Sequence, residues 1–215
     1  SLCTDAGAHD ATDVASTSDA ASYPSFVHAL PAGDLLITDS RTHTLHILSL
    51  GGEHRGVVDG GGALLFPMGV CASDDTIWVA DGLADSIHRL SLSTGAHLGA
   101  VGGLSTPHGL ALAGDTLFAA DWGGHRIQCF DAHSLQPTHS IGRFGDGDAE
   151  LCYPRGVCVA GRELFVADTE NHRVQVFTLR GRHVRSIGPI REPYAVAAAH
   201  GRLFVAQMDG RLKIL

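Results

Sequence analysis

The sequence predicts an all-β fold, a β-propeller of four-stranded antiparallel blades. Three observations support this prediction. A unit of about forty residues recurs along the chain, each unit contains short apolar segments separated by polar turns, and no segment shows the periodicity of an amphipathic helix. Units of this length that contain only strands are typical of propeller blades, whereas solenoid repeats contain helices or are shorter.

Each unit begins at a proline that leads into a short apolar run. The opening prolines are Pro24, Pro67, Pro107, Pro154 and Pro193. The propeller repeats therefore cover residues 24–66, 67–106, 107–153, 154–192 and 193–215. Runs such as Gly69-Val70-Cys71-Ala72 predict the first and innermost strand of each blade.

The second and third strands follow at fixed spacings. The second strand ends in an aspartate in four units and in glutamine in the fifth: Asp39, Asp81, Asp121, Asp168 and Gln207. A third strand begins a few residues later and alternates between apolar and polar side chains, most clearly in Arg173-Val174-Gln175-Val176-Phe177. A turn and a more polar fourth strand complete each unit except the last, which has room for three strands.

The fourth unit resembles an NHL repeat. The resemblance rests on residues 154–177, which include Val166-Ala167-Asp168-Thr169-Glu170-Asn171-His172, and on the preceding connection, residues 141–148. It extends over most of the chain and is clearest in residues 67–192. NHL propellers usually have six blades, so the resemblance leaves two arrangements open: five blade sectors, or a fragment of a six-bladed ring.

The N-terminal residues 1–23 read as a short strand followed by a polar linker. Closed propellers commonly complete one blade with strands from both ends of the chain, which removes the open sheet edge. We therefore expect residues 1–4 to pair with residues 211–215 and supply the fourth strand of the last blade.

Composition and charge limit the partners. The net charge of −8 disfavours general binding of RNA, because phosphate contacts need a surplus of Lys and Arg. The charge is uneven, however, since residues 150–215 carry a net +4, which keeps an acidic partner or RNA open. No apolar stretch is long enough to span a bilayer. Five cysteines without a C-x-x-C spacing indicate reduced thiols and a cytoplasmic location.

The recurring histidines indicate a structural role rather than metal binding. His43, His125 and His172 each stand four residues after the blade aspartate, and Asp85 takes this position in the second unit. Equivalent positions are spread around a ring rather than gathered, so we interpret each Asp and His as a hydrogen-bonded structural pair and expect no metal and no cofactor.

The candidate binding residues follow the opening prolines. This position varies while its neighbours do not, and it lies where the innermost strands begin, around the mouth of the channel: Ser25, Met68, His108, Arg155 and Tyr194. The last four are the predicted binding residues, because Met, Arg and aromatic side chains are enriched at protein interfaces. Trp122, at a turn, is a separate candidate.

The resemblance implies a non-catalytic module that binds protein partners, as a monomeric propeller within a larger protein such as a RING-type ubiquitin ligase. RNA binding, known for some NHL propellers, is the first alternative. A metal-dependent lyase or hydrolase is the second, since Pro107-His108-Gly109-Leu110 resembles a segment of the peptidylhydroxyglycine lyase propeller. Of that family's several zinc-binding histidines, only His108 is matched here, so we expect no enzyme.

Overall fold

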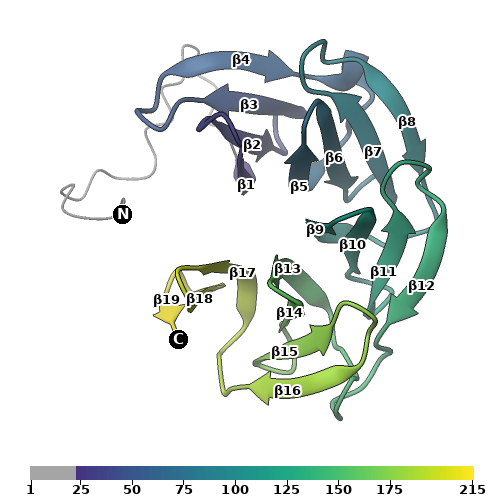
Figure 1. The fold of residues 1–215 in the computed structure, drawn as a ribbon, viewed down its shortest axis with the longest axis vertical. Helices are drawn as coiled ribbons and strands as arrows, with labels where there is room; N and C mark the ends of the chain where they lie inside the picture. The colour runs from purple at the N-terminus through teal and green to yellow at the C-terminus, as the bar shows by residue number, and fades with distance from the viewer. Residues whose placement is uncertain (1–22) are drawn as a thin grey trace.

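The computed structural model describes residues 23–215, which form five blades around a central channel (Figure 1). Four blades are four-stranded antiparallel sheets and the fifth has three strands, as the sequence predicts. The strands are β1 (Pro24–Ala29), β2 (Leu35–Asp39), β3 (Thr44–Leu48), β4 (His54–Val58), β5 (Pro67–Ser73), β6 (Thr76–Asp81), β7 (Ser86–Ser91), β8 (His97–Val101), β9 (Pro107–Ala113), β10 (Thr116–Asp121), β11 (Arg126–Asp131), β12 (Pro137–Ile141), β13 (Pro154–Ala160), β14 (Glu163–Asp168), β15 (Arg173–Thr178), β16 (His183–Ile187), β17 (Pro193–Ala199), β18 (Arg202–Gln207) and β19 (Leu212–Ile214).

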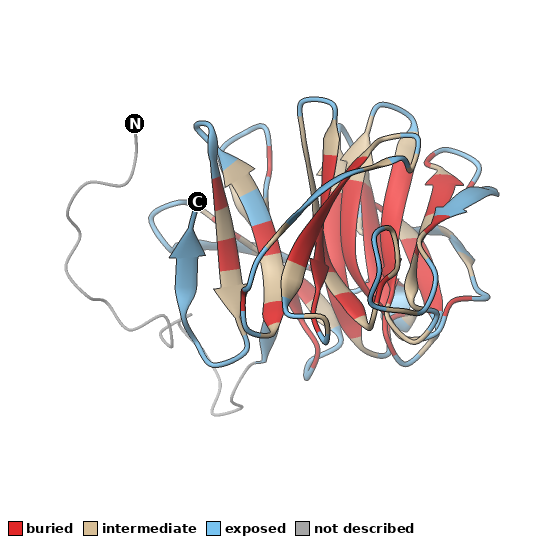
Figure 2. Cartoon of the chain, turned by 90° about the horizontal axis from the view of Figure 1, so that it is seen from below, coloured by how far each residue is buried: buried red, intermediate tan, exposed pale blue. Residues whose placement is uncertain are grey.

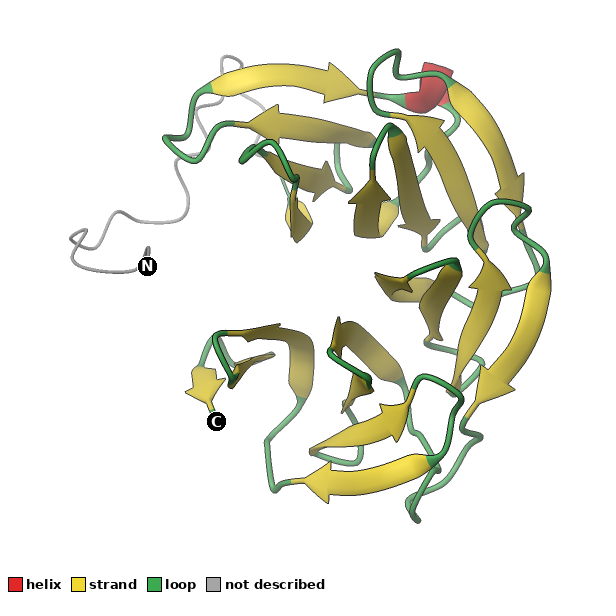
Figure 3. Ribbon diagram, viewed as in Figure 1, coloured by secondary structure: helices red, strands yellow, loops and turns green. Residues whose placement is uncertain are grey.

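The innermost strands β1, β5, β9, β13 and β17 each begin at an opening proline. Long connections carry the chain from the outer strand of one blade to the inner strand of the next, as between β12 and β13 (Figure 3). Within residues 23–215 the one helical segment is the 3-10 turn η1 (Gly60–Gly62), so none of them forms a helix long and apolar enough to cross a bilayer.

The ring is open between the first and last blades (Figure 1). Within the described part of the chain, β19 pairs with β18 and with no strand on its other side. The predicted pairing of residues 1–4 with residues 211–215 falls outside the described residues.

The hydrophobic core consists of four clusters, each between two consecutive blades. Figure 2 shows the burial concentrated in the strands and lost in the loops and in β19. Trp78 illustrates the packing: it is 3% exposed in the second blade, and its indole N–H donates to the carbonyl of Ala132 in the third blade at 3.0 Å. In the three middle blades the alternation of the inner strands thus buries one face against the preceding blade and the other against the next.

A glycine allows neighbouring inner strands to approach closely. A Cβ on Gly69 would lie 2.1 Å from the carbonyl oxygen of His108, and a Cβ on Gly109 would lie 2.6 Å from that of Arg155. Gly156 is similarly close to the backbone of Ala195. Any larger residue at these positions would push two blades apart.

Aspartates and histidines connect the blades, but not as the predicted pairs. The Asp168 carboxylate accepts the N–H of Cys152, which leads into its own blade, at 2.7 Å. The His125 imidazole of the preceding blade accepts the next N–H, that of Tyr153, at 3.2 Å. Asp85 binds Thr106 N–H in the same way, which explains why Asp can replace His at this position.

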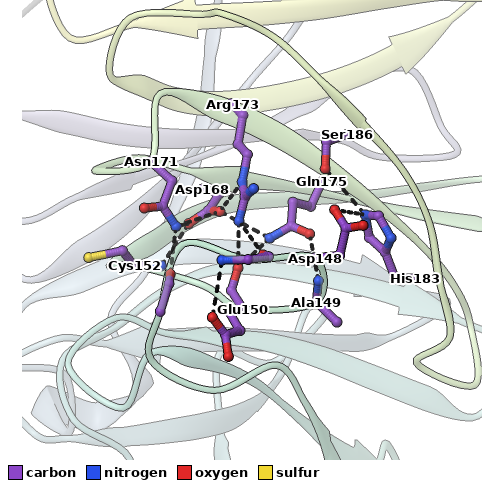
Figure 4. A network of polar contacts seen from close by, with 12 residues as sticks. Asp148, Ala149, Glu150, Cys152, Asp168, Asn171, Arg173, Gln175, His183 and Ser186 are labelled. Carbon is purple, nitrogen blue, oxygen red and sulfur yellow. Dashed lines mark hydrogen bonds and ion pairs between the residues drawn. The ribbon is translucent and has the colours of Figure 1, made fainter.

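Figure 4 shows the polar network around Asp168, a carboxylate with no exposure to solvent. Its oxygens accept hydrogen bonds from the side chains of Asn171, Arg173 and Gln175, with the Arg173 Nε at 2.8 Å. Arg173 and Gln175 in turn donate to the carbonyl of Glu150. The network therefore fixes the connection that leads into β13 and thereby the position of the residues that follow it.

Candidate functional site at one end of the channel

The central channel contains a cavity of about 950 Å³. Its walls are the inner strands, and most of the side chains are small or aliphatic, such as Val70, Leu110, Val157 and Val196. In blades two to five this lining begins beyond the residue that follows each opening proline. The predicted binding residues consequently lie at the end of the channel where the inner strands begin.

Arg155 is the centre of a group of contacts at this end. Its guanidinium carbon lies 5.6 Å from the ring centroid of Trp122 and 5.3 Å from that of Tyr194. Both distances are in the range of cation–π attraction, which is stronger where the cation is partly desolvated. Among the described residues, Arg155 makes no ion pair and no hydrogen bond through its side chain, so its charge is balanced only by the two rings.

Two further rings join Trp122. Its ring centroid is 4.5 Å from that of Tyr153 and 5.9 Å from that of His108. We refer to His108, Trp122, Tyr153, Arg155 and Tyr194 as the Arg155 cluster. The sequence treats Trp122 as a separate candidate, whereas the structure places it against His108 of its own blade and Arg155 of the next.

Aromatic contacts extend the cluster in both directions. On one side Tyr194 stacks on Phe26 of the first blade, with ring centroids 5.9 Å apart, so this contact crosses the opening of the ring. On the other side Tyr153 contacts His125, whose ring in turn lies 4.8 Å from the exposed Phe144. The result is a band of rings from the connection before β13 to the first blade.

His108 is the buried member of the cluster and is 6% exposed. Burial, and secondarily the positive charge of Arg155, lower the pKa of His108 to about 4. The imidazole is therefore neutral at physiological pH. It adds no second cation to the site.

Met68 takes no part in the aromatic and cation–π contacts of the cluster. It is 7% exposed, and its carbonyl accepts a hydrogen bond from the hydroxyl of Thr38 at 2.7 Å, between the first and second blades. The structure thus brings together three of the four predicted residues and Trp122, and it adds Tyr153 and Phe26. Tyr153 immediately precedes an opening proline, so examining both neighbours of each proline would have found it.

The described residues contain no group of three or more His, Cys, Asp and Glu side chains placed to hold a metal ion. Two histidine pairs do occur on the outer strands: His46 Nδ1 lies 3.2 Å from His54 Nε2, and His88 Nδ1 lies 3.0 Å from His97 Nε2. Each pair offers two nitrogens, fewer than the three or four protein ligands of a zinc site.

Comparison with protein families agrees with the repeat. A model of the NHL repeat matches residues 104–130 and 151–177. The chain is an NHL-repeat β-propeller. The two matched segments contain every member of the Arg155 cluster except Tyr194, so the candidate site lies largely on recognisable NHL repeats.

Solved structures resemble this NHL propeller in fold. The computationally designed protein Ika8 superposes with a TM-score of 0.66 at 12% identity, over 91% of this chain and 58% of that one. A catalytically inactive virginiamycin B lyase from Staphylococcus aureus, crystallised with quinupristin, gives 0.65 at 13% identity, over 89% and 69%. A chain of a nidogen/laminin complex gives 0.65 at 21% identity, over 80% and 66%. Comparison with curated protein sequences found no match.

Identities this low establish the fold alone. The NHL propeller spans 58% of the length of Ika8, less than two thirds of that chain. The blade count and the activity of these relatives therefore do not transfer to it.

Proposed function

We propose that this NHL propeller is a non-catalytic protein-interaction module whose partner binds at the end of the channel that carries the Arg155 cluster. The observation that supports this most strongly is the state of Arg155, a partly buried cation with rings on two sides and no carboxylate partner among the described residues. Arg, Trp and Tyr are also the residue types that contribute most to binding at protein interfaces.

The residue types at the channel mouth support a role without catalysis. A zinc-dependent lyase needs several nitrogen or oxygen ligands that converge at one end of the channel. His108 is the single histidine that follows an opening proline, and Met68, Arg155 and Tyr194 stand at the equivalent positions. Arg is always charged and does not serve as a ligand here.

The resemblance to NHL propellers suggests a wider setting. We propose that the propeller is the substrate-recognition part of a larger protein, such as a RING-type ubiquitin ligase. We also propose a cytoplasmic location, because the four described cysteines Cys71, Cys129, Cys152 and Cys158 are free thiols.

The test is an interaction measurement with single variants of the full chain. The wild-type chain identifies binding proteins, and their affinities are then measured for Arg155→Ala and Tyr194→Ala. Each variant should lose about 1–3 kcal/mol of binding free energy, as hot-spot residues do. Arg182→Ala is the matched control, since Arg182 is an exposed arginine at the outer turn between β15 and β16.

The outcome separates two faces of the molecule. Loss of binding in the Arg155 and Tyr194 variants, with unchanged binding of the Arg182 variant, supports the proposal. Unchanged binding in both cluster variants, together with loss on changing the outer turn, would show that the partner binds the rim of the blades instead.

A further inference from the structure

Three neighbouring side chains of the Arg155 cluster carry buried polar atoms without a partner. Five such atoms occur among the described residues, and three of them are His108 Nδ1, Trp122 Nε1 and Arg155 Nε. The rings of His108 and Trp122 are in contact, and Arg155 lies over Trp122. Native proteins satisfy nearly all buried polar groups, so this concentration is unusual and singles out the Arg155 cluster for a role in binding.

The unpaired atoms and the charge define what the ligand must offer. Trp122 Nε1 and Arg155 Nε are donors only, so both need acceptor oxygens. The Nη groups of Arg155 have no hydrogen-bond partner among the described residues and are not enclosed, and so they face the solvent at the channel mouth. A planar ligand with two acceptor oxygens fits a guanidinium in this state, since its two oxygens can accept two parallel N–H donors of the guanidinium.

No carboxylate of the described residues pairs with Arg155. Asp121 pairs with Arg126 and Asp168 with Arg173, each at 2.8 Å. Neither is therefore free to neutralise Arg155, so an acceptor on another molecule would meet an unpaired guanidinium.

We propose that the Arg155 cluster binds a carboxylate of an acidic segment in the partner protein, with an adjacent apolar side chain of that segment packed on Trp122 and Tyr194. This inference rests on the proposed function and names the chemistry of its partner. The contacts of the cluster include one cation, whereas phosphate and RNA sites gather several cations, and the net charge of −8 opposes a polyanion. A single carboxylate is repelled less strongly by this net negative charge than a polyanion is.

The two tryptophans of the chain give a direct readout. The indole N–H groups of Trp78 and Trp122 produce two resolved signals in a nitrogen–proton correlation spectrum, and Trp122→Phe assigns them. The probe is the blocked pentapeptide Gly-Asp-Phe-Ser-Gly, which carries one carboxylate, and its uncharged twin is Gly-Asn-Phe-Ser-Gly. Octauridylate is the third probe.

The acidic peptide should shift the Trp122 indole signal and the Arg155 Nε–H signal at millimolar concentration while leaving the Trp78 signal in place. It should bind at least tenfold more tightly than its amide twin. Arg155→Gln should reduce this difference in affinity to less than twofold. Arg155→Lys should retain only part of the difference, because lysine keeps the charge but lacks the planar pair of N–H donors. The control Arg182→Gln should retain all of it.

Three results would overturn the inference: equal binding of the amide twin, no shift of the Trp122 signal with any peptide, or tighter binding of octauridylate than of the acidic peptide. The last result would assign the site to RNA. If both peptides bind equally and Tyr194→Ala removes both, the site binds protein without reading a carboxylate, and the proposed function stands. If the variants melt at lower temperature, the Arg155→Lys comparison at a temperature where all are folded decides.

Discussion

Replacement of Gly69 by alanine tests how tightly the inner strands are packed. The added Cβ would lie 2.1 Å from the His108 carbonyl oxygen, 2.9 Å from Gly109 Cα and 2.9 Å from Leu110 N, all of them backbone atoms of β9. Favourable contacts of this kind need about 3.5 Å, so the second and third blades must separate by roughly 1 Å. A flexible side chain could turn away from the new methyl group. The backbone of β9, which is hydrogen-bonded to β10, cannot.

We expect Gly69→Ala to lower the free energy of unfolding by about 3 kcal/mol, at the upper end of the range for an overpacked core. For a chain of this size each kcal/mol corresponds to about 2–4 °C, so the melting temperature should fall by roughly 6–12 °C. The separation also loosens the cluster between the two blades, which contains Cys71, Trp78 and Leu110.

Gly56→Ala is the matched control. Gly56 lies in β4, has no atom within 4 Å of the added Cβ and does not have a positive φ. This change should stabilise the chain by about 0.5 kcal/mol, because alanine restricts the unfolded state. Urea and thermal unfolding, followed by circular dichroism, measure both variants. A difference of less than about 1 kcal/mol between them would refute the argument that the inner strands are in rigid contact.

Three further predictions concern buried polar groups and thiols. Asp168→Ala should destabilise the chain by about 3–5 kcal/mol in urea unfolding, since it leaves the paired Arg173 charge without a partner, whereas Glu163→Ala, at an exposed ion pair, should change stability by less than about 1 kcal/mol. His108 has a lowered pKa of about 4 against an ordinary 6.5, so its contribution to the free energy of unfolding is complete above pH 6.5 and is lost as the pH falls toward 4. His108→Gln should therefore flatten the dependence of stability on pH in this window by up to about 3 kcal/mol. An unchanged slope would contradict the buried neutral imidazole. Burial raises the pKa of the Cys129 thiol to about 12, so iodoacetamide followed by mass spectrometry should label Cys152, which is partly exposed, well before Cys129, and equal rates would show that the third blade opens readily.

The sequence was sufficient for the fold because its strongest signals are local. The opening prolines, the strand alternation and the terminal aspartates recur at one spacing, and each depends on backbone geometry that neighbouring residues determine. The role of His125 was harder to predict. Its hydrogen bond to Tyr153 joins residues 28 apart, one in a turn of the third blade and one in the connection to the fourth, and no local pattern shows which backbone N–H a side chain will reach.

The candidate site was predicted in part for the same reason. His108, Arg155 and Tyr194 share a repeat position, so the sequence could place them at one end of the channel. The contact of Arg155 with Trp122 could not be derived, because the turn after β10 and the start of β13 meet only when the third and fourth blades pack. Burial of Met68 follows from the contact between the first two blades and was equally beyond a single repeat.

The departures from the repeat lie on both sides of the opening in the ring. The glycine that lets inner strands approach is present as Gly69, Gly109 and Gly156, but the first blade has Phe26 at this position and the fifth has Ala195. A side chain at this position is incompatible with the close approach seen between the middle blades. Phe26 instead contacts Tyr194 across the opening through its ring. The replacement of glycine by phenylalanine in the first blade therefore extends the aromatic band of the candidate site to that blade.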